Sequence, residues 1–228
     1  MSVMRKFFSH RDRMFADPPV ARALFNQTEW AWIWLIARLY LGYEWISAAS
    51  HKLFDPRWMS TGEAIKGFWT RAAAVPEPPA RPLIAYDWYR DFIQFLLDGG
   101  HYVWFGKLIA ISEFTVGVAL VLGAFVGIAA VAGAFMNWHF MMAGTASINP
   151  VLIILSILLI LAWKTAGWLG LDRWLLPAVG TPWQPGKFAG FLPRLRGRPD
   201  EGSRPRPGGT PPASAGGGVV NSGGAENQ

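Results

Sequence analysis

The chain has 228 residues, of which 52% are hydrophobic and only 16% are charged, fewer charges than an ordinary soluble domain carries. Its net charge is +6, but the basic residues lie mainly in the two terminal segments that flank apolar stretches, so we exclude nucleic-acid binding. The absence of cysteine excludes disulfides, thiolate metal ligands and iron–sulfur ligation within this chain.

Residues 1–29 are basic and lack the apolar core of a cleavable signal peptide, so we expect a cytoplasmic N-terminal segment. The chain that follows contains four stretches that are apolar enough to cross a bilayer, which needs roughly 20 residues. They cover about 30–51, 102–122, 124–143 and 149–165. The sequence therefore predicts an all-α integral membrane protein, with a four-helix transmembrane bundle over 30–184. Gly123 predicts a tight turn between the second and third spans, and Pro150 suits the first turn of the fourth.

The segment 53–101 between the first two spans is too long to lack structure. Ser60 or Thr61 can cap a helix that ends near Ala74, and Asp87 can cap a second helix. Four apolar residues of this second helix are expected to share a face: Trp88, Phe92, Phe95 and Leu96. We expect the helix to lie at the membrane interface or to pack as a cap over the bundle, and both can hold together.

Beyond the fourth span, WLGLDRWLLP predicts a short interfacial helix over 168–177 with Trp168 and Trp174 as anchors. The segment 185–228 is rich in Pro, Gly, Ser and Arg, which indicates a disordered tail. An even number of spans places both basic termini on one side. We place them in the cytoplasm, at a bacterial or archaeal plasma membrane, so the loop 53–101 is extracytoplasmic.

Charged residues inside the predicted spans are the strongest pointer to function, because a charge in hydrocarbon costs at least ~2.5–3.5 kcal/mol and usually faces a bundle interior. At 1.5 Å per residue, Arg38 lies level with Glu113 and Glu44 level with Lys107 on antiparallel spans. This predicts two cross-helix ion pairs. One straight seam cannot hold both, since six residues separate Arg38 from Glu44 and turn the helix by about 120°. Pairs that only fix helix register are the alternative, above all for Arg38 and Glu113.

The outer half of the bundle gathers six polar residues: Glu44, His51, Lys52, Lys107, Asn137 and His139. We interpret them as a pocket for a quinone head group, in which Glu44, His51 and His139 exchange protons. Lys52, Lys107 and Asn137 would then bind the ring oxygens. Asn137 can instead stabilise the packing of neighbouring helices, and the side chains of His51 and Lys52 can extend to the membrane–water interface. Haem ligation by His51 and His139 is disfavoured, because neither lies near the middle of its span.

Several motifs together resemble the DoxX/DoxD family of four-helix membrane proteins. They are ARLYLGYEW followed by HKL, the loop sequence IAYDWYRDFIQF, FMNWHFMMAGTASINP and WLGLDRWLLP. The match covers about residues 28–184, and its loop is closest to the DoxD type linked with thiosulfate:quinone oxidoreductase. Family-typical residues present here are Arg38, Gly42, Lys52, Glu113 and Gly117.

The resemblance implies a membrane subunit that passes electrons from thiosulfate or another reduced sulfur compound to quinone. A non-catalytic anchor or scaffold for redox partner proteins is the alternative. A small-solute transporter is less favoured, because the chain shows no inverted repeat. The expected partners are the lipid bilayer and either another redox subunit or further copies of this chain.

Overall fold

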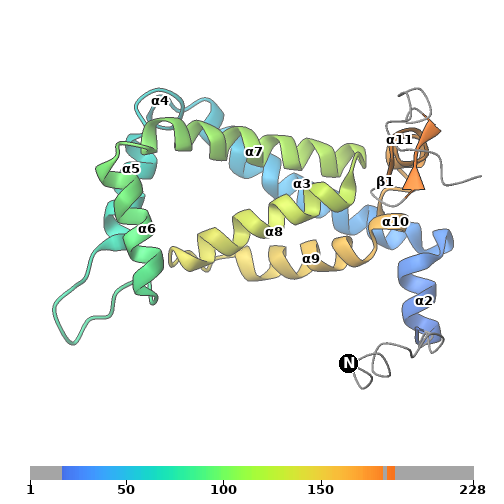
Figure 1. The fold of residues 1–228 in the computed structure, drawn as a ribbon, viewed down its shortest axis with the longest axis horizontal. Helices are drawn as coiled ribbons and strands as arrows, with labels where there is room; N and C mark the ends of the chain where they lie inside the picture. Colours follow the sequence, from blue (N-terminus) through green and yellow to red (C-terminus); the bar gives the residue numbers. More distant parts are fainter. Residues whose placement is uncertain (1–16, 182–183, 188–228) are drawn as a thin grey trace, which may run out of the picture. The chain divides into compact units, whose positions relative to one another are not determined.

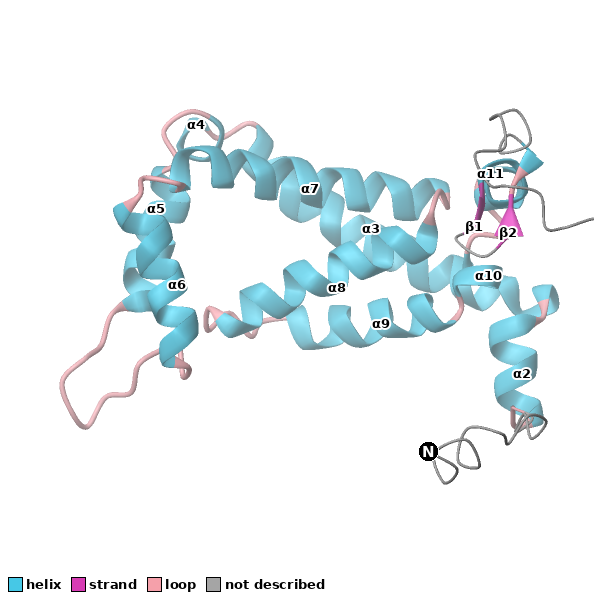
Figure 2. Ribbon diagram, viewed as in Figure 1, coloured by secondary structure: helices cyan, strands magenta, loops and turns pink. Residues whose placement is uncertain are grey.

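The computed structural model describes residues 17–181 and 184–187. These residues are helical apart from turns, loops such as 74–86 and one antiparallel pair of two-residue strands, so the predicted all-α fold class is confirmed (Figure 2). Residues 1–16 of the expected N-terminal segment, and nearly all of the predicted disordered tail, lie outside the described residues. The elements in order are α2 (Pro19–Asn26), the 3-10 helix η1 (Thr28–Trp30), α3 (Ala31–Leu53), α4 (Pro56–Met59), α5 (Glu63–Ala73), α6 (Asp87–Asp98), α7 (Tyr102–Leu122), α8 (Val126–Met142), α9 (Asn149–Leu161), α10 (Trp163–Ala166), α11 (Asp172–Val179), β1 (Gly180–Thr181) and β2 (Gln184–Pro185).

Four long helices occupy the ranges predicted as spans: α3 packs against α7, and α8 packs against α9 (Figure 1). The fourth ends early, at Leu161, and α10 follows after Ala162. Among the described helices, α7 alone is both long and apolar enough to cross a bilayer by itself. The helices α8 and α9 are apolar but shorter, with 17 and 13 residues.

Small residues set the distance between α3 and α7. A Cβ atom on Gly117 would lie 2.9 Å from the carbonyl oxygen of Gly42, so neither helix has room for a larger residue there. One face of α7 carries a stripe of mostly small residues that points inward, since Gly106, Ala110, Glu113 and Gly117 are all buried. The corresponding stripe of α8 is buried as well: Ala129, Gly133 and Asn137.

Arg38 of α3 caps the end of α7. Its Nη1 donates to the carbonyl oxygens of Leu120 and Val121 at 2.7 and 2.6 Å, and its Nη2 donates to Leu169 O at 2.6 Å. The last carbonyl groups of a helix have no intrahelical partner and carry partial negative charge, so a buried guanidinium is well matched to them. The predicted ion pair between Arg38 and Glu113 is therefore wrong.

Asp172 caps the start of α8 from the other side of the same turn. Its carboxylate accepts the backbone N–H groups of Phe125 and Val126 at 2.5 and 2.9 Å. Gly123, at φ 67°, makes the tight turn that was predicted. A Cβ atom on Gly170 would lie 2.8 Å from the Cα atom of Gly123, which explains the glycine in WLGLDRW. The short helix predicted over 168–177 begins only at Asp172, because this residue turns inward to the cap.

The first loop helix begins differently from the prediction. Neither Ser60 nor Thr61 is the N-cap of α5, which begins at Glu63 after Gly62. Gly62 has φ 71°, and a Cβ atom there would lie 2.6 Å from the carbonyl oxygen of Tyr102. The close approach of the two chain segments therefore requires glycine at the cap position.

The second loop helix, α6, has two apolar faces instead of the single one predicted. Leu96 is buried together with Tyr89 and Ile93, whereas Trp88, Phe92 and Phe95 are exposed. The buried face packs with α5 and the ends of α7 and α8, which confirms the alternative of a cap over the bundle. The predicted Asp87 cap is wrong, because Asp87 is the first helical residue and its carboxylate pairs with Arg90.

Candidate functional site

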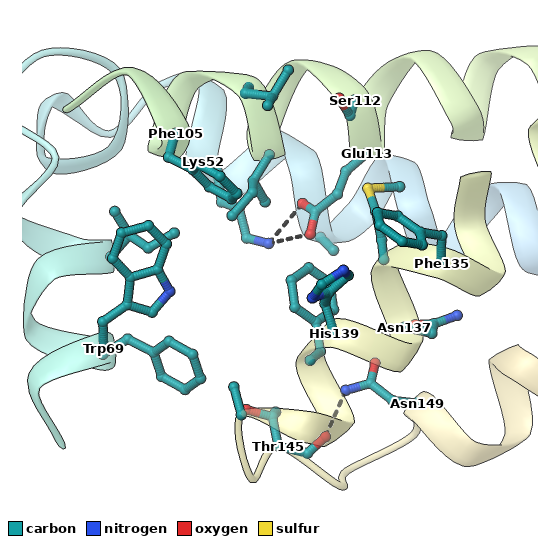
Figure 3. A pocket seen from close by; sticks show the side chains of 18 of the residues that line it. Lys52, Trp69, Phe105, Ser112, Glu113, Phe135, Asn137, His139, Thr145 and Asn149 are labelled. Carbon is teal, nitrogen blue, oxygen red and sulfur yellow. Dashed lines mark hydrogen bonds and ion pairs between the residues drawn. The ribbon is translucent and has the colours of Figure 1, made fainter. Parts of the chain in front are cut away.

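A cavity of about 920 Å³ lies within the bundle, where α5 and α6 cover the ends of α7 and α8 (Figure 3). Its volume is at the upper end of the usual range for small-molecule sites, roughly 300–1,000 Å³. Most of the wall is aromatic or aliphatic. The aromatic residues include Trp58, Phe68, Trp69, Phe105, Phe135 and Phe140. Such a wall suits a large apolar ligand, so the few polar side chains must decide which ligand binds.

Lys52 and Glu113 form the charged part of the cavity. The Nζ atom of Lys52 lies 2.5 and 2.6 Å from the two carboxylate oxygens of Glu113. The ring centroids of Trp58 and Phe140 lie 4.9 and 5.6 Å from the same atom, within cation–π distance. An ammonium group has three N–H donors, and two of them serve Glu113. One donor remains for a ligand.

Asn137 of α8 carries the clearest unused hydrogen-bonding groups of the cavity. It is fully buried and lines the cavity, yet neither its Oδ1 nor its Nδ2 atom has a hydrogen-bond partner among the described residues. The indole Nε1 of Trp45, which also lines the cavity, is buried and unpartnered in the same way. Buried polar groups without partners are costly and rare in proteins. A ligand with oxygen atoms would satisfy both donors.

His139 is held by Tyr89 of the covering helix α6. The Tyr89 hydroxyl oxygen lies 3.0 Å from His139 Nδ1 and 3.1 Å from the His139 carbonyl oxygen. The ring centroids of Phe135 and Trp138 lie 4.4 and 4.7 Å from the centroid of the imidazole ring. Burial raises the pKa of Tyr89 to about 12, so its hydroxyl keeps its proton at neutral pH.

The cavity brings together most, but not all, of the predicted site residues. Glu44, Lys52, Asn137 and His139 line it, and so does Glu113, which had been assigned to a structural pair. His51 is exposed and outside the lining. His51 and Lys52 are consecutive residues of α3, so their side chains point in different directions around the helix, and only Lys52 faces the cavity.

Lys107 is half-buried and also outside the cavity lining. No ion pair joins it to Glu44 among the described residues, so that predicted pair is wrong. Two residues at equal depth on antiparallel helices form an ion pair only if both side chains point toward each other, and depth does not determine the rotation of either helix. Glu113 pairs with Lys52 instead.

Sequence reasoning missed two polar members of the site, Tyr89 and Trp45. Both belong to aromatic-rich stretches, where a ring reads as packing or as an interfacial anchor. The spacing of Tyr89, Ile93 and Leu96 at i, i+4 and i+7 is a helical face, and it could have indicated that Tyr89 points toward the bundle.

Comparisons of the chain with protein-family models, with curated proteins and with solved structures found no match. The DoxX/DoxD resemblance and the reduced sulfur donor that it implies therefore stay predictions. What the cavity itself can bind is the firmer basis for a function.

Proposed function

We propose that this chain is an integral membrane protein whose four long helices cross the bilayer. Their outward faces carry large apolar residues that are more than half exposed, among them Ile36, Tyr43, Ile111, Ile128, Val131 and Ile154. Soluble monomers rarely expose apolar surface on this scale, whereas lipid is a suitable solvent for it. At 1.5 Å per residue, α3 is about 34 Å long, enough for a hydrocarbon core of ~30 Å.

We further propose that the cavity binds a neutral, lipid-soluble ring that carries oxygen atoms, which is the chemistry of a quinone. The charged residues of the lining are Lys52 and Arg71 against Glu44 and Glu113, so the formal charge of the wall is zero. A dianion such as thiosulfate gains no net attraction there. The aromatic wall favours an apolar body, and the unpartnered donors favour oxygen acceptors on it.

The residues present fit a quinone head group. Asn137 Nδ2, Trp45 Nε1 and the third N–H of Lys52 are donors for ring carbonyl oxygens. Glu113, His139 and Glu44 are titratable groups of the cavity wall that can hold or release a proton near those oxygens. Bound quinone would supply two-electron acceptor chemistry. The chain would then act as the membrane subunit of a quinone-linked oxidoreductase.

The buried and unpartnered amide of Asn137 is the observation that carries this proposal, and it also gives the test. The purified protein in lipid nanodiscs is titrated with decylubiquinone, and tryptophan fluorescence reports binding, since Trp45, Trp58 and Trp69 line the cavity. We expect Asn137→Leu to weaken binding about tenfold, the value of one good hydrogen bond. The same variant should raise the melting temperature of the ligand-free protein, because it removes a buried polar group that lacks partners.

A matched control is Asn26→Leu on the exposed surface of α2, which should change neither quantity. If Asn137 only stabilises helix packing, Asn137→Leu will instead lower the melting temperature and leave quinone binding unchanged. Absence of saturable binding by the wild-type protein would overturn the quinone proposal. A scaffold without a ligand would then be the better account.

A further inference from the structure

The contact between Tyr89 and His139 restricts where the imidazole proton can lie. A tyrosine hydroxyl has one proton to donate, and a carbonyl oxygen can only accept. If Tyr89 donates to the His139 carbonyl at 3.1 Å, then its oxygen must accept from Nδ1 at 3.0 Å. If it donates to Nδ1 instead, two oxygen atoms with opposed lone pairs face each other at 3.1 Å. Only the first arrangement turns both contacts into hydrogen bonds, and it requires a proton on Nδ1.

The surroundings of His139 also favour the neutral ring. Its neighbours are the aromatic rings of Phe135, Trp138 and Tyr89, at centroid distances of 4.4, 4.7 and 5.8 Å. No described carboxylate forms an ion pair with the imidazole. A neutral imidazole protonated at Nδ1 has a lone pair at Nε2, and no described residue hydrogen-bonds to that atom.

We propose that Tyr89 is a positioning residue that fixes the Nδ1–H form of His139, so that the cavity offers a hydrogen-bond acceptor at Nε2 and prefers the reduced, hydroxyl-bearing form of the ring. A quinone carbonyl cannot donate to Nε2, whereas a quinol hydroxyl can. This inference rests on the proposed quinone site and adds the redox form that the site selects.

The preference has a measurable consequence for the chemistry. One additional neutral hydrogen bond corresponds to about threefold to tenfold tighter binding of the reduced form. Tighter binding of the reduced form raises the midpoint potential of a bound couple. A tenfold preference is equivalent to about 30 mV for two electrons. The bound acceptor would be a correspondingly stronger oxidant than the free one.

The test compares the affinities of decylubiquinol and decylubiquinone under anaerobic conditions for the wild type, Tyr89→Phe and Tyr86→Phe. Tyr86 is the N-cap residue of α6, three positions before Tyr89, and its side chain is exposed, which makes it a matched control. We expect a threefold to tenfold preference for the quinol in the wild type and in Tyr86→Phe, and its loss in Tyr89→Phe. A merely structural role of Tyr89 would weaken both ligands equally and leave their ratio unchanged.

A second measurement needs no ligand. The ¹⁵N spectrum of histidine-labelled protein, with His139→Gln to assign the signal, should show a protonated Nδ1 and a bare Nε2 for His139. A proton on Nε2 in place of Nδ1 would overturn the inference. So would equal affinity for the two ring forms. Failure of both forms to bind would overturn the quinone site itself, and the ¹⁵N result would still decide the role of Tyr89.

Discussion

Replacing Lys52 with methionine would leave the Glu113 carboxylate buried without its cation. The Glu113 side chain is 1% exposed, and the Lys52 side chain is 20% exposed. At an effective dielectric constant of ~20, two unit charges ~3 Å apart attract by roughly 5–6 kcal/mol. Breaking a buried pair typically costs about 3–5 kcal/mol, since the remaining group can take up a proton. For a chain of this size that loss lowers the melting temperature by about 6–20 °C.

The double variant Lys52→Met/Glu113→Met separates stability from function. With both charges replaced by apolar groups of similar length, the free energy of unfolding should return to within about 1 kcal/mol of the wild-type value. Quinone binding should not return, because the ammonium donor is absent. Thermal unfolding in detergent, followed by fluorescence, measures both variants. Arg57→Met is the control, because its exposed pair with Asp55 should contribute less than about 1 kcal/mol. Equal destabilisation of the single and double variants would refute the reasoning.

Three further outcomes are expected. Gly117→Ala should lower the free energy of unfolding by about 1–3 kcal/mol, because its Cβ atom would lie 2.9 Å from the Gly42 carbonyl oxygen. In the control Gly67→Ala the new Cβ atom meets nothing closer than 3.5 Å, so this variant should be neutral or stabilising. Comparable melting temperatures of the two variants would contradict this expectation. Asp172→Asn should lower stability by about 0.5–2 kcal/mol in the same unfolding assay, since the amide can accept only one of the two capping N–H groups well. For Tyr89, the folded-state pKa of about 12 exceeds the unfolded value of ~10, so its contribution to stability is present below pH ~10 and is lost as the pH rises through about 12. Absorbance titration of wild type minus Tyr89→Phe should therefore show phenolate formation near pH 12, and a transition near pH 10 would contradict the burial.

The sequence predicted the ranges of the long helices well, because the length of an apolar stretch is a local signal. The turn at Gly123 was identifiable for the same reason. The partners of the buried charges were not. Arg38 binds backbone carbonyl groups of α7 and Leu169, and carbonyl groups are present at every position, so the sequence cannot mark which of them accept. The rotation of α3 likewise determines that Lys52, and not His51, lines the cavity. The two residues are neighbours in the chain, so an estimate of their depth in the membrane cannot tell them apart.

The two ends of the bundle use buried charge in opposite ways. At the α7–α8 turn, Arg38 and Asp172 meet helix ends whose backbone groups need partners, and both nitrogen termini of the guanidinium and both carboxylate oxygens are occupied. Of the guanidinium nitrogen atoms only Nε has no partner among the described residues, so helix capping accounts for nearly all of this arrangement. In the cavity, Lys52 keeps a spare donor while Asn137 keeps an entire amide unpartnered. A protein that needed only stability would gain by placing leucine at Asn137. The cost of retaining the amide is explained most simply if a ligand offsets it, and for this reason we assign function to the Lys52 end of the bundle and architecture to the Arg38 end.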